Sequence, residues 1–479
     1  MRKSSSMTCG KTDVNPALLA KLGAFIETHM GLHYPPAHLD DLARGLGTAA
    51  SDFGFDSVQA CAEWLLSSPT LQPMQIKTLA NHLTIGETHF FRDKKLFEIL
   101  ETQVFPEIIN SRRGGQQNLR IWSAACSSGE EPYSLAILLA RMLPDLQNWN
   151  ISILATDISP SSLKKAGEGL YSEWSFRDTP SWVKERCFAR AGKKFQLHKQ
   201  FRRMVTFAPI NLIEDGYPAI INGTNAMDII FCRNVLMYFS RDHAEAVTDN
   251  LARCLVDGGW LVFSPFDYPG SECSAMVHRV SFPGALFYRK GPKPPIPTQK
   301  TTNGPTKSTV RQTLTPTPPV QTTRPAIPPP PQDKAQRDPR ENEDTTSLAR
   351  QVRQLADQGK LAEALTMSEE AVKSDKLNPS LYYLQASILQ EIGKQEEAAA
   401  ALQRALYIDQ EFAVAHFALG HLLHRQKRYQ EAGKHLEKAR SLLSGLAPED
   451  IPPEGEGISA GRLIALIHTM TGDRQRRAE

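Results

Sequence analysis

The stretch Leu119-Arg-Ile-Trp-Ser-Ala-Ala-Cys-Ser-Ser-Gly-Glu-Glu-Pro-Tyr-Ser134 gives the strongest indication of how the region around it folds. It begins with a short apolar run, continues into small residues and one glycine, and then reaches two glutamates and Pro132. Proline is favoured in the first turn of a helix, and apolar residues recur at a helical spacing from Leu135 to Leu143. The stretch therefore predicts a strand, a tight loop and a helix, which form the first half of a nucleotide-type βαβ unit.

The two acidic residues of this loop, Glu130 and Glu131, indicate what kind of ligand fits. A phosphate-binding turn presents bare N–H groups, usually with a lysine or further glycines, and two carboxylates would repel a phosphate. A ligand with hydroxyls or a positive charge suits the loop better. S-adenosylmethionine (SAM), which carries a sulfonium and a ribose but no phosphate, has these properties.

A third acid supports a nucleoside ligand. The β-branched run Ile151-Ser-Ile-Leu-Ala-Thr-Asp157 ends in Asp157. An acid at the end of the second strand is placed to accept hydrogen bonds from ribose hydroxyls. Taken alone, Asp157 could equally well cap the helix that begins at Ser159-Pro160. The loop and Asp157 together, in this order, favour a nucleoside.

Length and composition set the bounds of the molecule. The 479 residues are enough for two or three domains, and a net charge of +3 implies no overall attraction to nucleic acid or to a membrane surface. The seven cysteines form no CxxC pair, which argues against a zinc site or a disulfide framework and for a reducing compartment. No apolar run is long enough to span a membrane, and the start of the chain lacks a signal-peptide pattern. We expect a cytoplasmic protein with no direct membrane insertion.

Changes of pattern along the chain predict its domains. Helical spacing dominates 14–113, strands and helices alternate through 114–290, and residues 168–208 interrupt the alternation with short β-like runs that suggest a small antiparallel sheet. The alternation predicts an α/β, Rossmann-like domain whose mostly parallel sheet is covered on both faces. Residues 291–345 are rich in proline and threonine, so we expect a disordered linker.

The region 346–445 contains an internal repeat of 34 residues. Small residues recur at this spacing, as Ala364, Ala398 and Ala432 show. A helix-turn-helix unit of this length resembles the tetratricopeptide repeat (TPR), an all-α module that stacks into a protein-binding solenoid. Residues 446–479 are expected to supply a capping helix and a tail.

The region 14–290 resembles the CheR family of protein-glutamate methyltransferases. Five motifs in the family's order carry the resemblance: Thr84-Ile-Gly-Glu-Thr-His-Phe-Phe-Arg-Asp93, Trp122-Ser-Ala-Ala-Cys-Ser-Ser-Gly-Glu-Glu-Pro-Tyr-Ser134, Ala155-Thr-Asp-Ile158, Asn211-Leu212 and Phe231-Cys-Arg-Asn-Val-Leu-Met-Tyr-Phe239. The resemblance implies an N-terminal helical domain, a SAM-binding domain and an inserted β-subdomain. It also implies methyl transfer from SAM to glutamate carboxylates of a chemoreceptor-like signalling protein, as in chemosensory adaptation.

The resemblance assigns roles to individual residues. It implies that Ala124, Glu130 and Asp157 surround the amino acid and ribose of SAM, and that Asn211 and Leu212 contact its adenine. The remaining residues would lie at the methionine end (Thr88, Arg233, Asn234) or face the transferable methyl group (Arg92, Tyr238). Considered singly, Arg92 could instead form a surface ion pair, and Tyr238 could be a core aromatic residue.

The chemistry agrees with these residue types. A glutamate side chain has an ordinary pKa of roughly 4.3 and is already a carboxylate nucleophile at neutral pH, so no general base is required. The reaction needs alignment and exclusion of water, and an arginine fork with a tyrosine hydroxyl can supply the alignment. The alternative is a SAM-binding scaffold of weak or no activity whose TPR module binds protein partners.

Two positions depart from the family pattern. The stretch His38-Leu-Asp-Asp-Leu-Ala-Arg-Gly-Leu46 carries two acids where receptor-docking members often have a basic helix. Ser264-Pro-Phe-Asp267 stands where many members have a Ser-Glu pair, which alters either the pocket wall or only the local packing. A basic pair of doublets, Lys193-Lys194 and Arg202-Arg203, is read as a solvated hairpin in preference to a dock for an acidic segment. No basic, aromatic-rich surface for nucleic acid is evident.

Overall fold

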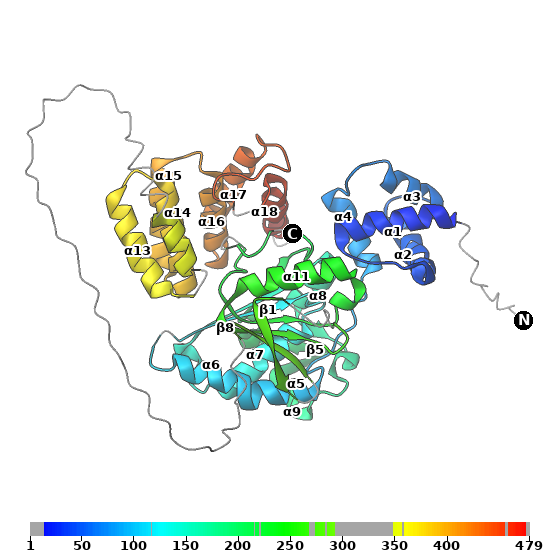
Figure 1. Cartoon of the computed structure of the whole chain (residues 1–479), viewed down its shortest axis with the longest axis horizontal. Coiled ribbons are helices and arrows are strands. Elements are labelled where there is room, and N and C mark those ends of the chain that lie inside the picture. Colours follow the sequence, from blue (N-terminus) through cyan, green and yellow to red (C-terminus); the bar gives the residue numbers. More distant parts are fainter. Residues whose placement is uncertain are drawn as a thin grey trace, which may run out of the picture.

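A computed structural model of the chain describes residues 14–115, 117–214, 216–219, 222–267, 274–282, 285–292, 348–356, 359–455 and 458–475. Nearly all of the predicted linker 291–345 lies outside the described residues. Figure 1 shows a helical group at the N-terminal end, a central unit built on a sheet, and a second helical group at the C-terminal end.

The N-terminal group consists of four helices, α1 (Pro16–Met30), α2 (Leu39–Asp52), α3 (Val58–Leu66) and α4 (Pro73–Leu83). Leu22, Ile26, Leu42 and Leu79 are fully buried, as expected for one apolar face per helix. A loop with left-handed residues at Phe91 and Asp93 then leads to α5 (Lys94–Ile99), the π-helical turn η2 (Leu100–Val104) and α6 (Phe105–Arg112).

The central sheet has seven strands in the order β6-β2-β1-β7-β8-β10-β9. Its strands are β1 (Asn118–Ala124), β2 (Asn150–Asp157), β6 (Val205–Pro209), β7 (Met227–Cys232), β8 (Leu255–Phe263), β9 (Val277–Phe282) and β10 (Ala285–Lys290). The first five strands in chain order pair in parallel, while β9 and β10 form an antiparallel hairpin at one edge. The predicted mostly parallel sheet is confirmed.

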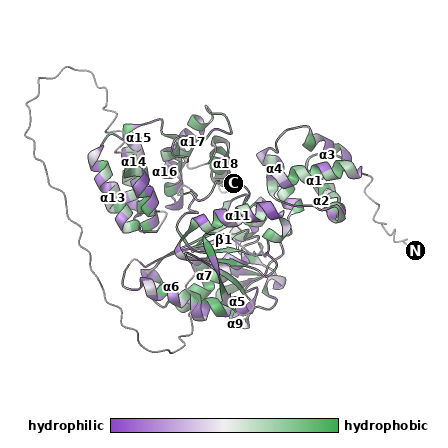
Figure 2. Cartoon of the chain, in the orientation of Figure 1, coloured by the Kyte–Doolittle hydropathy of each residue, from purple (hydrophilic) through white to green (hydrophobic). Residues whose placement is uncertain are grey.

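Both faces of this sheet are covered. Along β7, Ile229 and Phe231 belong to one apolar cluster, whereas Ile230 and Cys232 belong to another, because alternate side chains of a strand point to opposite faces. The first cluster includes α7 (Glu130–Met142) and α5, and the second includes α11 (Arg241–Cys254). The strands of the sheet are hydrophobic in Figure 2, as a sheet buried on both faces requires.

The insertion after α8 (Pro160–Glu168) forms a small antiparallel sheet of β3 (Leu170–Tyr171), β5 (Lys194–Leu197) and β4 (Phe188–Ala191), with η4 (Glu173–Phe176), α9 (Ser181–Cys187) and α10 (Lys199–Arg202) beside it. One part of the prediction was wrong. The run 204–208 was expected in this insertion, but it forms β6, which pairs in parallel with β2 and extends the main sheet.

The C-terminal group contains a helix over 348–356 followed by α13 (Leu361–Ser374), α14 (Pro379–Ile392), α15 (Gln395–Ile408), α16 (Ala413–Arg425), α17 (Tyr429–Leu443) and α18 (Ala460–Gln475). The repeated alanines at 364, 398 and 432 are all buried. At Gly420, an added Cβ would lie 2.7 Å from the side chain of Leu436 on the next helix. The 34-residue period therefore reflects the close approach of the two helices in a hairpin, as predicted for tetratricopeptide repeats.

Candidate active site

The loop between β1 and α7 has a strained, tightly fixed backbone. Ala125, Ser127 and Gly129 all have positive φ, and an added Cβ at Gly129 would lie 2.8 Å from the Cβ of Ala166. The backbone N–H of Cys126 donates to the carbonyl of Thr156 at the end of β2. Small residues and one glycine are needed because the loop passes directly over the carboxyl ends of two neighbouring strands, where open α/β sheets bind their ligands.

Asp157 holds this loop and also begins the next helix. One carboxylate oxygen, Oδ2, accepts from the backbone N–H of Ser127 at 2.8 Å, and Oδ1 accepts from the N–H of Ser159 at 2.9 Å. Asp157 can therefore cap the helix and bind a ligand at the same time, since each carboxylate oxygen retains a second lone pair for a hydroxyl. Burial raises the pKa of Asp157, while the backbone N–H groups act in the opposite direction.

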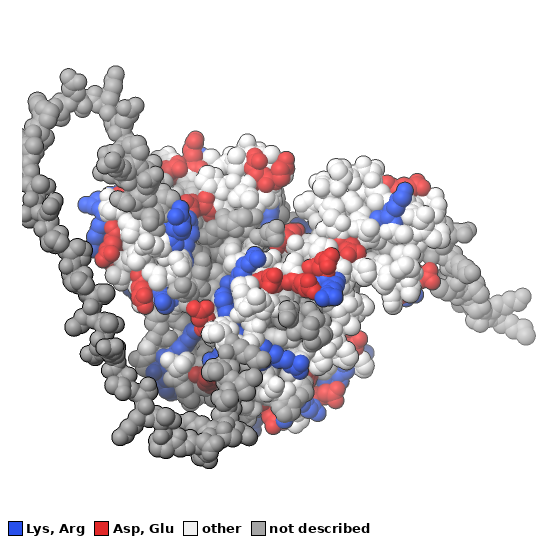
Figure 3. Space-filling view, in the orientation of Figure 1, with Lys and Arg blue, Asp and Glu red and all other residues white. Residues whose placement is uncertain are grey.

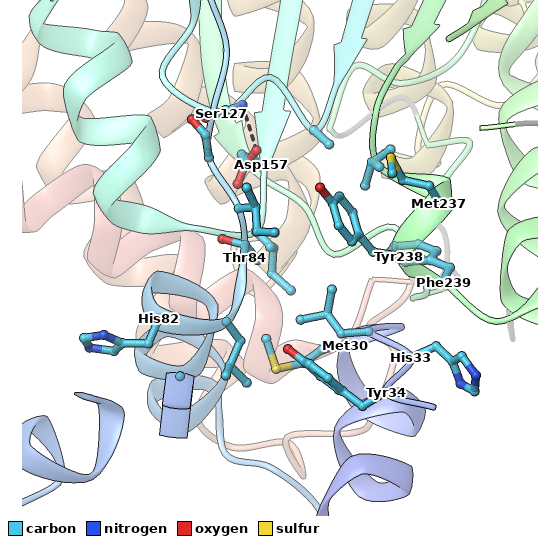
Figure 4. Close-up of a pocket in the computed structure, with 18 of the residues that line it drawn as sticks. Met30, His33, Tyr34, His82, Thr84, Ser127, Asp157, Met237, Tyr238 and Phe239 are labelled. Atoms are coloured by element: carbon cyan, nitrogen blue, oxygen red, sulfur yellow. Dashed lines mark hydrogen bonds between the residues drawn. The ribbon is translucent and has the colours of Figure 1, made fainter. Parts of the chain in front are cut away.

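A cavity of about 830 Å³ opens beside Asp157 (Figure 4). One wall comes from the sheet and its loops, including Ser127, Asn211, Leu212 and Tyr238. The opposite wall comes from the N-terminal helices and the segments after them. Its lining includes Met30, Tyr34, His82 and Thr84. In Figure 4, the Tyr238 hydroxyl points to the side of the cavity on which Ser127 and Asp157 lie.

Asn211 lies at the end of this cavity that follows β6. Its side-chain Nδ2 donates to the carbonyl of His29 at 2.9 Å and to Oε1 of Glu214 at 3.2 Å. Ile210 and Leu212 line the same region with apolar side chains. An apolar slot with one amide beside it suits a flat heteroaromatic ring such as adenine.

A second, smaller cavity of about 50 Å³ shares Ile85, Ala125, Ser127 and Asn234 with the large one. Its other lining residues include charged groups from three loops and helices, namely Glu87, Arg92, Glu131 and Arg233, together with Thr88, His89, Phe97 and Cys126. The two cavities thus meet where the sequence places the methionine end of the ligand.

The charges around the small cavity are organised by Arg233. Its guanidinium is 4% exposed and pairs with Glu131 at 3.1 Å and with Asp93 at 3.4 Å. Glu131 also accepts from the Ser123 hydroxyl at 2.8 Å. Arg92 donates to the Glu87 carbonyl at 3.2 Å, and burial, together with the nearby charge of Arg233, lowers its pKa. Because Arg92 has no carboxylate within ion-pair distance among the described residues, its fork remains available to an incoming acid.

Two other groups at the small cavity are uncharged. Burial raises the pKa of the Cys126 thiol well above its usual range, and the acids nearby act in the same direction, so a thiolate nucleophile is disfavoured. Burial and the charge of Arg177 lower the pKa of His89, and its Nδ1 has no hydrogen-bond partner among the described residues. Nothing in the sequence pattern distinguishes His89 from its neighbours in the motif Thr84–Asp93.

The predicted residues do not all line the two cavities. Asp157, Asn211, Leu212, Asn234 and Tyr238 line the large cavity, and Thr88, Arg92, Arg233 and Asn234 line the small one. Ala124 is buried at the end of β1 and lines neither.

Glu130 lies away from both cavities as well. Its carboxylate is 2% exposed and accepts from the hydroxyls of Ser128 at 2.7 Å and Ser175 at 3.0 Å. The neighbouring Glu131, whose role the sequence left open between helix-dipole partner and ligand contact, lines the small cavity instead. A ligand role for Glu130 stays a prediction, and the geometry favours Glu131.

The Ser264–Asp267 departure has a structural role. The buried carboxylate of Asp267 accepts from the backbone N–H groups of Asn234, Val235 and Met237 and from the backbone and hydroxyl of Ser264. Asn234 is left-handed, with φ 60°. Asp267 therefore fixes the segment that carries Asn234 and Tyr238 into the cavity, a role that the sequence pattern did not reveal.

Comparison with known proteins agrees with this geometry. The family model for the CheR methyltransferase SAM-binding domain matches residues 86–264. Chemotaxis protein methyltransferase 2 of Vibrio cholerae is 34% identical over 217 residues, which are 45% of this chain and 73% of that protein. The chain belongs to the CheR methyltransferase family. It is accordingly a SAM-dependent methyltransferase related to the enzymes of chemosensory signalling.

The C-terminal helices match known families as well. Models of the tetratricopeptide repeat match residues 386–427 and 413–442. A probable biofilm formation methyltransferase, WspC of Pseudomonas aeruginosa, is 28% identical over 363 residues, which are 73% of this chain and 81% of that protein. The alignment with WspC is too long to be confined to the CheR domain. A CheR domain joined to TPR repeats is therefore the architecture of this chain.

The residues present fit SAM. Asp157 offers acceptors for ribose hydroxyls, Ile210 and Leu212 offer apolar walls for adenine, and Glu131 offers a carboxylate where the ammonium and sulfonium charges would lie. The described residues contain no cluster of three or more metal-ligating side chains, and no described helix is long and apolar enough to cross a membrane.

Proposed function

We propose that this methyltransferase esterifies glutamate side chains of a chemoreceptor-like signalling protein. The observation that carries the proposal is the position of Arg92, a half-buried guanidinium with no carboxylate partner among the described residues, in the lining of the small cavity that adjoins the large one. A cation in that position binds and orients a carboxylate. We further propose that the enzyme acts in the cytoplasm, where thiols stay reduced, because its seven cysteines are odd in number and form no CxxC pair.

The chain's own residues would align the acceptor. Arg92 would hold one oxygen of the substrate carboxylate, and the Tyr238 hydroxyl would donate to the same group. Bound SAM supplies an electrophilic methyl group on a sulfonium. Glu131, Asp157 and Asn211 would hold the donor, while the N-terminal helices exclude water from the opposite side of the cavity. Such positioning contributes most of the rate when the nucleophile needs no activation.

The regions would divide the work. We propose that 14–113 and 114–290, with the subdomain inserted between α8 and β6, form the catalytic unit, and that 346–445 and the tail to 479 select or regulate a protein partner. The TPR family match supports a protein-binding role for the repeats. On the visible face in Figure 3, basic and acidic side chains are interspersed, which gives no support to a nucleic-acid partner.

The test is transfer of labelled methyl from SAM to a cognate receptor, read as base-labile ester. Arg92→Ala should abolish turnover, with a loss of at least 100-fold, and should change SAM affinity little, because Arg92 is assigned to the acceptor. Arg241→Ala, which removes an exposed arginine at the start of α11 that lines neither cavity, is the matched control. Turnover unchanged in Arg92→Ala removes it from the reaction, and a wild-type protein that binds SAM but esterifies no cognate receptor favours the scaffold alternative.

A further inference from the structure

The inner face of the repeats lies against the methyltransferase unit. The first helices of two successive hairpins, α14 and α16, and the final helix α18 line a cavity of about 240 Å³ whose other wall is the β6–β2 edge of the sheet. In Figure 1 the repeats lie directly beside this unit. Concave faces of such solenoids are their usual binding surfaces, so part of that surface here faces the chain's own catalytic unit.

Polar and apolar contacts connect the repeats to the methyltransferase unit. The side chain of Asn225 donates to Glu391 of α14 at 2.6 Å, and that of Asn150 donates to the Glu391 carbonyl at 3.3 Å. Arg462 of α18 forms an ion pair with Glu214. Ala219, from the loop after β6, is buried in the apolar cluster of the repeats.

The charged residues that line this cavity are unbalanced. Three arginines, Arg120 from β1, Arg425 from α16 and Arg462 from α18, line it together with one carboxylate, Glu391. Arg462 has Glu214 as its partner. Arg120 donates from one guanidinium nitrogen to the carbonyls of Gly223 and Asn225, at 3.0 and 3.1 Å, but its buried Nε has no acceptor among the described residues.

Arg425 has no carboxylate within ion-pair distance among the described residues. Burial lowers its pKa, and the nearby charge of a second cation, Arg120, acts in the same direction. Two guanidinium groups from different domains that face one cavity repel each other unless an anion lies between them. The adjoining walls are apolar, with Phe417, Leu466 and Phe207 among the lining residues, and burial holds the pKa of His421 down to about 4.

We propose that this interdomain cavity is a binding site for a small anion, a carboxylate or phosphate, that bridges Arg120 of the methyltransferase unit and Arg425 of the repeats. The cavity is below the range of about 300–1,000 Å³ typical of sites for drug-sized ligands, so the occupant is a small molecule or a single acidic group. Guanidinium forks suit both oxyanions, and the apolar wall favours one with a short hydrocarbon body.

The site is connected to the cofactor cavity. Ile210 lines both cavities. Arg462 pairs with Glu214, and Glu214 in turn accepts from Asn211, which lines the cofactor cavity. Because α16 and α18 pack in one apolar cluster, an anion that draws α16 toward the sheet also shifts α18, and through Arg462 and Glu214 the position of Asn211. By linkage, SAM must then change the affinity for the anion by the same factor.

The experiment uses the full chain and calorimetric titration at constant ionic strength. Glutarate and inorganic phosphate are the two probes, and glutaramide, which is uncharged, is the control ligand. We expect saturable binding of at least one anion and none of glutaramide. Arg425→Gln should weaken that binding at least tenfold, whereas Arg440→Gln, on the exposed pair with Glu437, should not change it. Arg120→Gln is the second variant, accepted only if its thermal unfolding matches wild type.

Three outcomes overturn the proposal. These are no saturable binding of either anion, equal binding of glutaramide, or binding unaffected by both arginine variants. SAM affinity is then measured with and without the bound anion. We expect at least a threefold change in wild type and none in Glu214→Gln, and an unchanged SAM affinity in wild type overturns the connection between the sites. These titrations need no receptor, so they remain informative even if the glutamate substrate is wrong.

Discussion

Asp267 is the residue whose replacement tests the description of the active site most directly. In Asp267→Asn, one carboxylate oxygen becomes an NH₂ group. Oδ1 accepts from the backbone N–H groups of Val235 and Met237, and Oδ2 accepts from Asn234 and from both donors of Ser264. Whichever way the new amide turns, its NH₂ faces at least two donors in place of an acceptor.

The expected loss of stability follows from the number of backbone donors that lose their acceptor. Leaving one buried donor without an acceptor costs about 1–3 kcal/mol, and Met237 lies at the partly exposed end of the segment. We therefore expect the free energy of unfolding to fall by about 2–4 kcal/mol. Asn234 and Tyr238 also lose their fixed positions, and a displacement of about 1 Å at a reacting group costs on the order of 100-fold in rate.

The assays are denaturant unfolding of the full chain and kcat/KM for methyl transfer. Asp257→Asn is the matched control, because Asp257 is exposed at the start of β8 and has no ion pair among the described residues. A second variant, Ser264→Ala, removes one donor and keeps the carboxylate, so its effect should be smaller. If Asp267→Asn keeps both wild-type stability and wild-type kcat/KM, the assigned positioning role is refuted.

Two further predictions concern the acids of the cofactor cavity. Glu131→Gln should weaken SAM binding at least tenfold, since it removes a charge at the small cavity and the partner of Arg233. Glu130→Gln should change SAM affinity less than threefold, because the two serine hydroxyls that bond to Glu130 can reorient. Direct titration with SAM measures both effects, and a larger loss in Glu130→Gln would identify Glu130 as the ligand. For Asp157, burial raises the folded-state pKa, so the charged form that accepts from ribose hydroxyls is lost as pH falls through a value higher than for an exposed aspartate. SAM affinity should decrease in that acidic range. The apo protein should gain stability there relative to neutral pH as far as Asp157 contributes, because protonation removes a buried charge. Asp157→Asn should show neither of these two pH dependences.

The sequence predicted the parts of this structure that depend on local pattern. The strand, loop and helix from Leu119 to Ser134, the acid at the end of β2 and the 34-residue period all follow from which residues must be buried and how often. The strand at 205–209 was misplaced because its β-like composition is the same whether it joins the small sheet or the large one. Only the pairing with β2 distinguishes the two.

Side-chain direction at the site could not be predicted in the same way. Glu130 and Glu131 are adjacent in the first turn of α7, and successive helical residues point about 100° apart. A small rotation of that turn therefore decides which carboxylate faces the cavity. Likewise, nothing in the spacing of Ser264-Pro-Phe-Asp267 indicates that its acid reaches back to residues 234–237.

The cofactor cavity is closed only because the N-terminal helices, which are separate from the sheet in the sequence, contact its loops. The N–H of His33 donates to the Tyr238 carbonyl at 2.8 Å, Asn211 donates to the His29 carbonyl, and Asn81 accepts from Ser159 and Ser161 at the start of α8. These bonds tie the N-terminal helices to three loops of the sheet edge. The cavity has one wall on each unit, so the sheet alone would leave it open to water on one side. Since transfer to a carboxylate depends on alignment and on exclusion of water, the N-terminal helices belong to the catalytic unit as much as the SAM-binding loop does.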